Sequence, residues 1–139
     1  MNNIELEKII SDTQSDPYIK WNNSSLADWC RVDGEFSVYL FNRDGNHGYF
    51  SLLHNLTSKV DGIIVELGNR EGLGILSIYD ALQPDSKFYT LDIVNDNRFI
   101  KNEIKNDPRV NILNDFNSLD NDRIEKTFEK KSISMIFLD

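Results

Sequence analysis

The stretch Ile63 to Gly74, which reads IIVELGNREGLG, constrains the fold of this chain more than any other. A run of apolar β-branched residues ends at Glu66, a loop with three glycines follows, and an apolar helical pattern continues to Leu82. A strand that stops at a glycine-rich loop and restarts as a helix is typical of a nucleotide-binding corner. Glycine lets a ligand approach the backbone closely, and the start of the helix supplies unpaired N–H groups.

Strand and helix patterns alternate from Gly62 to the last residue. We predict four strands and three helices, and Pro84 and Pro108 stop the first two helices. Such alternation implies an α/β fold with a parallel sheet and right-handed crossovers. The expected strands are 63–66, 88–92, 110–113 and 133–138, and the expected helices are about 73–82, 97–106 and 118–129.

Residues 1–60 form a less regular lead-in, which we separate from a domain at 61–139. Apolar residues between Ile4 and Ile10 predict a short amphipathic helix, and those from Tyr49 to Leu56 predict a helix that packs on the sheet. Between them we expect a helix around Trp29 and Cys30. An extended segment at 36–41 with a turn at 42–46 would give a possible short hairpin.

Acidic residues stand at the expected ends of the strands. Asp92 lies 24 residues after Gly68, where a carboxylate at the tip of a second strand binds the two hydroxyls of a ribose. Asp115 follows the third strand and Asp139 the fourth. Because the carboxyl ends of parallel strands share one edge of the sheet, we expect these acidic residues to lie at that edge. Plain turns at Asp92 and Asp115 remain the alternative.

The spacing E-x-G-x-x-x-G-x-G from Glu66 to Gly74 resembles the first motif of the class I S-adenosylmethionine-dependent methyltransferases. The resemblance implies a Rossmann-like sheet of order 3-2-1-4. It also implies that Glu66 and Gly68 hold the methionine end of the cofactor and that Gly72 and Gly74 let the loop close over it. A carboxylate at the loop entrance would repel phosphates but suit an ammonium group. A tight turn without a ligand is the competing interpretation.

The same resemblance implies a role for each acid that follows a strand. Asp92 would bind the ribose and Asp115 the adenine amino group, although Asn114 replaces the glycine that the family commonly has. Asp139 would border the acceptor site. Some small-molecule O-methyltransferases bind a metal there, but we predict none, because Asp139 also carries the terminal carboxylate. Asn69 and Ile93, which neighbour these residues, complete the predicted cofactor site.

The resemblance covers residues 62–139, which correspond to the first half of the family's fold. The family's sheet continues with further strands, so we expect a truncated sheet whose last strand is an apolar edge. We therefore predict a homo-oligomer that forms through residues 133–138.

The composition of the chain limits the classes of partner that it can bind. The net charge of −8 and the pI of about 4.7 argue against nucleic acid, because phosphate binding needs a basic face. No apolar run approaches the roughly 18 residues of a membrane span, and the N-terminus lacks the pattern of a signal peptide. The lone Cys30 favours a reducing cytoplasm. A small molecule as methyl acceptor is compatible with this negative net charge.

Two other functions stay open from the sequence. A methyltransferase-like fold without catalysis would serve ligand binding or assembly. A dinucleotide-binding oxidoreductase fragment is the other, but the glycine spacing differs from G-x-G-x-x-G. His47 and His54 are candidate bases, yet a structural role is favoured for both because no cysteine or acid completes a metal set. The catalytic base and the acceptor are not identified.

Overall fold

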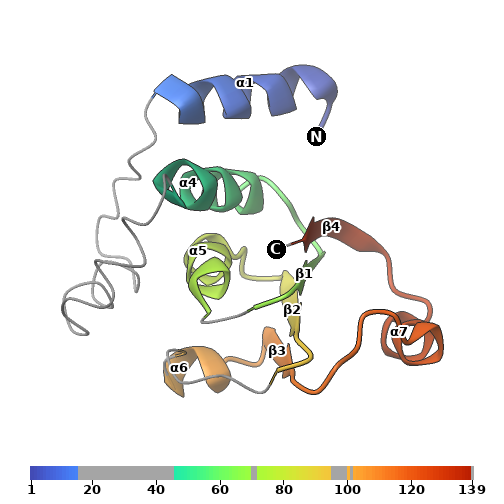
Figure 1. The fold of residues 1–139 in the computed structure, drawn as a ribbon. Coiled ribbons are helices and arrows are strands. Elements are labelled where there is room, and N and C mark those ends of the chain that lie inside the picture. The colour runs from blue at the N-terminus through green and yellow to red at the C-terminus, as the bar shows by residue number, and fades with distance from the viewer. Residues whose placement is uncertain (16–45, 70–71, 95–99, 101, 139) are drawn as a thin grey trace.

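The computed structural model describes residues 1–15, 46–69, 72–94, 100 and 102–138. It is an α/β fold built on a parallel sheet of four strands in the order β3-β2-β1-β4, which confirms the predicted 3-2-1-4 order (Figure 1). The strands are β1 (Ile63–Leu67), β2 (Lys87–Leu91), β3 (Val110–Leu113) and β4 (Ile133–Leu138). The helices are α1 (Asn3–Ser15), α4 (Asn46–Thr57), α5 (Leu73–Ala81), α6 (Asn102–Lys105) and α7 (Asn121–Phe128).

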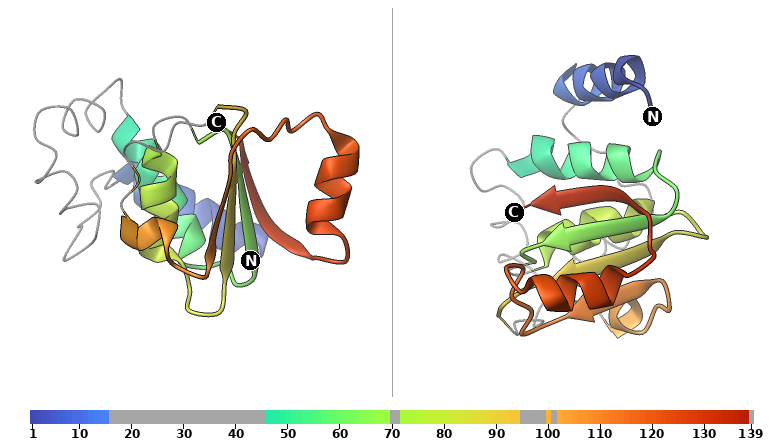
Figure 2. Two further views of the ribbon diagram at one scale, coloured as in Figure 1. Left: turned by 90° about the horizontal axis from the view of Figure 1, so that it is seen from below. Right: turned by 90° about the vertical axis from the view of Figure 1, so that its right-hand side faces the viewer.

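The helices cover the two faces of the sheet unequally. Helices α4, α5 and α6 lie on one side of the sheet, and among the described helices α7 alone lies on the other (Figure 2). Helix α1 packs on α4 and lies outside the layer that touches the sheet (Figure 1). The face that carries α5 is therefore the better covered of the two.

Alternation along each strand divides the apolar side chains between two cores. Ile64 on β1 and Phe88 on β2 point to the α5 side, where they are fully buried against Ile75 and Ile78 of α5 and Ile104 of α6. Side chains one position further along the strands point the opposite way, because strand residues alternate between faces. The opposite core contains Val65, Tyr89, Leu91 and Phe116, and α7 adds only Ile124 and Phe128.

Helix α1 begins with a reciprocal cap. The side-chain oxygen of Asn2 accepts a hydrogen bond from the Glu5 amide at 3.0 Å, and Glu5 accepts one from the Asn2 amide at 2.8 Å. Near its other end, the buried Thr13 accepts a hydrogen bond from Asn55 of α4 at 3.0 Å. The predicted helix around Trp29 and Cys30 and the predicted hairpin lie outside the described residues.

The predicted helices differ from the observed ones mainly at their starts. Helix α7 begins at Asn121 and not near 118, because the Asp120 side chain caps it by accepting from the Arg123 amide at 3.1 Å. In place of the predicted helix 97–106, the described residues contain α6 at Asn102–Lys105, with 95–99 and 101 outside the description. None of the described helices is long and apolar enough to cross a membrane.

Candidate functional site

All four strands end in leucine, and the register aligns these leucines across the sheet. Leu67 pairs with Leu91 on one side and with Leu138 on the other, while Leu91 pairs with Leu113. They form a row along the carboxyl edge, on the face that carries α7. Within the row, Leu91 on β2 is only 2% exposed, whereas Leu138 on β4 is 70% exposed. The row is thus covered at β2 and open at β4.

Asp92, the residue after β2, connects the loops on both sides of its strand. Its carboxylate accepts hydrogen bonds from the Asn69 amide and the Val94 amide, each at 2.8 Å. Its own carbonyl accepts from the Phe116 amide at 2.8 Å, and its amide donates to Leu113 at 3.1 Å. The side chain is buried. Asp92 therefore sets the relative position of the glycine loop after β1 and the loop after β3.

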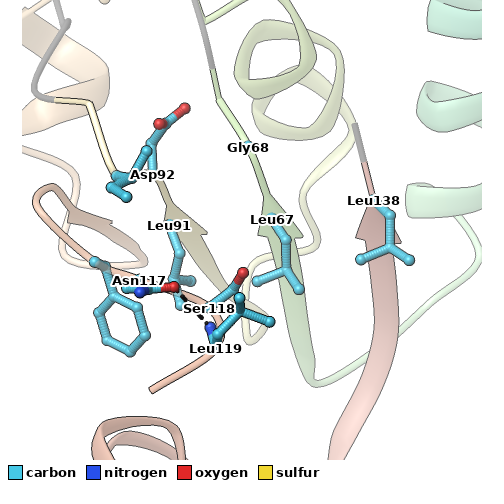
Figure 3. A pocket seen from close by; sticks show the side chains of 10 residues that line it. Leu67, Gly68, Leu91, Asp92, Asn117, Ser118, Leu119 and Leu138 are labelled. Atoms are coloured by element: carbon cyan, nitrogen blue, oxygen red, sulfur yellow. Dashed lines mark hydrogen bonds between the residues drawn. The ribbon is translucent and has the colours of Figure 1, made fainter. Parts of the chain in front are cut away.

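A cavity of about 360 Å³ opens beside Asp92 at this edge (Figure 3). Leucine side chains form one side of it, and Figure 3 shows the Asp92 carboxylate turned away from them, toward the glycine loop. The volume lies at the lower end of the range for small-molecule sites. The lining residues are Leu67, Gly68, Leu91, Asp92, Ile93, Phe116, Asn117, Ser118, Leu119 and Leu138.

The glycine loop contains two positions where only glycine fits easily. Gly68 has a φ of 93° and Gly72 a φ of 90°, both in the region that side chains disfavour. A Cβ atom on Gly72 would also lie 2.9 Å from Cγ1 of Ile100. The Gly72 amide donates to the Asn69 carbonyl at 2.7 Å, which closes the turn before α5.

Asn69 carries polar groups that the structure leaves without partners. It is 3% exposed, and neither the oxygen nor the nitrogen of its carboxamide has a hydrogen-bond partner among the residues that the structure describes. The side-chain oxygen of Asn114, after β3, is also buried and unpartnered. Buried polar groups are normally satisfied, so such groups at one edge call for an explanation, and ordered water or a ligand would provide it.

Glu66 lies inside β1, which runs one residue past it to Leu67. Because strand residues alternate, Glu66 shares a face with Ile64 and points to the α5 side, away from the leucine row. It is 1% exposed and accepts a hydrogen bond from the Thr90 hydroxyl at 2.6 Å. The sequence pattern suggested a carboxylate at the loop entrance, whereas the structure places it beneath the loop.

An arginine of α7 holds the loop after β3. Asp115 has a φ of 54°, a conformation that Asn and Asp tolerate better than most residues, and its side chain is exposed. Arg123 donates to the Asp115 carbonyl at 2.6 Å, and its guanidinium lies 4.3 Å from the centre of the Phe116 ring. Arg123 thereby fixes the segment that forms one wall of the cavity.

Some of the predicted site residues line the cavity, and others do not. Gly68, Asp92 and Ile93 line it. Glu66 lies on the opposite face of the sheet, against Gly74 in the first turn of α5. Asn69 and Asp115 are next to lining residues in the chain without lining the cavity themselves, and the Gly72 amide donates to Asn69. Asp139 lies outside the described residues.

Sequence reasoning missed the apolar part of the site. The leucines that end β1, β2 and β4, and the segment from Phe116 to Leu119, were not among the predicted residues. A signal was present, since a leucine is next to Glu66, Asp92 and Asp139 in the sequence.

His54 lies at the other end of α5 from the cavity. Its Nε2 atom is 2.9 Å from Oδ2 of Asp80, and this contact connects α4 to the last turn of α5. That placement agrees with a structural role. No group of three metal-binding side chains occurs among the residues that the structure describes.

A second hollow, of about 560 Å³, lies along α1. It is lined by Met1, Glu5, Lys8, Ile9, Asp12 and Lys59. Most of these side chains are exposed, and α1 lies outside the layer that covers the sheet. We regard the smaller cavity as the candidate site because ligands of open α/β sheets bind at the carboxyl ends of the strands.

Comparisons with family models, curated proteins and solved structures find no match for this chain.

Proposed function

We propose that this chain binds S-adenosylmethionine and belongs to an enzyme that transfers its methyl group to a small molecule. One observation carries the proposal: the buried carboxylate of Asp92 stands at the tip of β2, beside Gly68 and hydrogen-bonded to the Asn69 amide of the glycine loop. The amides of Asn69 and Val94 donate to this carboxylate and fix its orientation at the end of the strand. A carboxylate is a chemically suitable acceptor for the two hydroxyls of a ribose.

The lining of the cavity fits the rest of an adenosyl group. Apolar side chains from β1, β2 and the loop after β3 offer a surface for a flat base, with the polar Asn117 and Ser118 at its margin. Asp92 is the one charged residue among the described residues that line the cavity. A carboxylate at this position suits the ribose of S-adenosylmethionine and that of a dinucleotide, so the titration below includes both kinds of ligand.

When bound, the cofactor supplies an electrophilic methyl group. The contribution of the chain is to bind and orient it: Asp92 by hydrogen bonding, Gly68 by allowing close approach of the backbone, and the leucine row by excluding water. The residues described here do not identify the base or the acceptor.

Calorimetric titration tests the proposal. S-Adenosylhomocysteine should bind and NAD should not, and Asp92→Asn should weaken binding about tenfold or more, because the amide replaces one carboxylate oxygen with a donor. Asp122→Asn, an exposed change in the first turn of α7, is the matched control and should bind like the unmodified chain. Preference for NAD, or equal effects of both substitutions, would contradict the proposal.

A non-catalytic binding module is the alternative, and it shares the same cofactor site. Binding of S-adenosylhomocysteine without methyl transfer to any of a panel of small alcohols, phenols and amines would favour that alternative. Methyl transfer to one of them would support the enzyme.

A further inference from the structure

We infer that Glu66 is a positioning residue: it holds the first turn of α5, and with it the glycine loop, and does not touch the cofactor. The effect on ligand binding rests on the proposed function, whereas the effect on the loop does not. This inference differs from the role that the motif suggested, in which the acid contacts the methionine end directly.

The sheet encloses the carboxyl group of Glu66 from both sides. The register places Glu66 beside Thr90 of β2 and beside Phe137 of β4. Thr90 is fully buried, and its hydroxyl donates to Oε2 of Glu66 at 2.6 Å. A carboxyl group that is 1% exposed and held in this way has no open path to a ligand in the cavity on the opposite face.

Helix α5 encloses the same carboxyl group from above. A Cβ atom built on Gly74 would lie 2.1 Å from Oε1 of Glu66, well inside van der Waals contact. Gly74 is in the first turn of α5, where the N–H groups and the helix dipole favour a negative charge. The last glycine of the motif is therefore required by Glu66. Gly72 differs, because Ile100 is what a side chain there would meet.

This contact reaches the cofactor site through the backbone. Helix α5 begins directly after Gly72, whose amide donates to Asn69, and the Asn69 amide donates in turn to Asp92. A shift of the first turn of α5 would move each of these groups. Glu66 therefore acts on every ligand that uses Asp92, whether or not that ligand carries an ammonium group.

Two ligands distinguish indirect from direct action. S-Adenosylhomocysteine carries the amino acid portion, while 5′-methylthioadenosine keeps the adenosine and lacks the ammonium. Glu66→Gln, which preserves the size of the side chain, should weaken both by the same factor, about tenfold. Thr90→Val should act in the same direction. Weakening confined to S-adenosylhomocysteine would overturn the inference, because it would place Glu66 on the ammonium.

A stability cycle tests the contact with Gly74 without any ligand. Gly74→Ala should lower the midpoint of thermal unfolding by about 5 °C or more, and this loss should largely vanish when Glu66→Ala removes the carboxyl group. Gly72→Ala is the matched control and should cost the same in both backgrounds. Equal losses from Gly74→Ala in the two backgrounds would overturn the inference.

The two tests separate the two proposals. If the unmodified chain binds neither ligand, the proposed function fails, and the stability cycle alone decides the role of Glu66. If Glu66→Ala does not fold, Glu66→Asp takes its place, because it withdraws the carboxyl group by one methylene. In the Glu66→Asp background, too, Gly74→Ala should then lower the midpoint of thermal unfolding much less than in the unmodified chain.

Discussion

At Gly72 two independent constraints act on a single residue. The backbone has a φ of 90°, and a Cβ atom would press against Ile100, which is itself buried. We expect Gly72→Ala to lower the free energy of unfolding by about 1–3 kcal/mol, because it adds backbone strain to a steric clash. Urea unfolding measures this. Ser132→Ala, at an exposed position outside the helices and strands, is the control and should be neutral. A neutral Gly72→Ala would show that the loop adapts.

Glu66 shows where sequence reasoning stops at the residue scale. The pattern correctly assigned the acid and the three glycines to one strand–loop–helix unit. It did not show which face of the sheet the acid occupies, because a shift of the pairing register by one residue turns every side chain of a strand to the other face. Asp92 was easier to place, since a residue just after a strand stands at the edge in either register.

At the scale of elements, Asp107 and Arg109 connect α5 to the start of β3. Arg109 donates to Asp107 through Nε at 3.0 Å and Nη2 at 2.7 Å, and Nη1 reaches the Leu82 carbonyl at 3.2 Å. Tyr79 of α5 also donates to Asp107, at 3.1 Å. The hydrogen bonds from the Arg109 side chain hold the pKa of Asp107 far below its usual range.

A lowered pKa in the folded state gives this carboxylate a defined pH dependence. Its stabilisation is present above the unfolded pKa of about 4 and is lost as the pH falls toward the folded pKa. We expect Asp107→Asn to cost about 1–2 kcal/mol at pH 7 and progressively less below pH 4. Unfolding curves from pH 7 to pH 2.5 measure this. Asp85→Asn, in an exposed turn, is the control. A constant difference across this range would contradict the account.

The elements themselves were largely predictable from the sequence. Strands β2, β3 and β4 and helix α5 agree with the prediction within one residue, because β-branched runs between prolines and glycines leave few alternatives. The cavity was not predictable from the sequence, because it depends on how the leucine row aligns across strands that are far apart in the chain. Register of that kind is a tertiary property, and a strand's own sequence does not reveal it.

At the scale of the whole molecule, β4 is an edge strand of the sheet and exposes more apolar side-chain surface than the other described strands. In the part of the chain that the structure describes, β4 pairs only with β1, and it contains no charged residue. Ile136 and Leu138 are 58% and 70% exposed. We propose that two copies pair antiparallel along this edge, because that arrangement is self-complementary about a twofold axis and satisfies the free backbone groups.

Sedimentation velocity over a concentration series tests this pairing. The unmodified chain should show a dimer that grows with concentration, and Ile136→Lys should shift it toward monomer, because a charge on an edge strand opposes pairing. Leu119→Lys, at an exposed leucine outside β4, should leave the dimer unchanged. A monomer at every concentration would exclude the proposal.

The site itself can be located by NMR in one titration. Amide chemical shifts of the chain would be followed as S-adenosylhomocysteine is added to saturation. The account predicts the largest changes in three segments that meet at the carboxyl edge, namely 67–69, 91–93 and 116–119. Changes confined to the hollow along α1, or no change at saturating ligand, would contradict a cofactor site at this edge of the sheet.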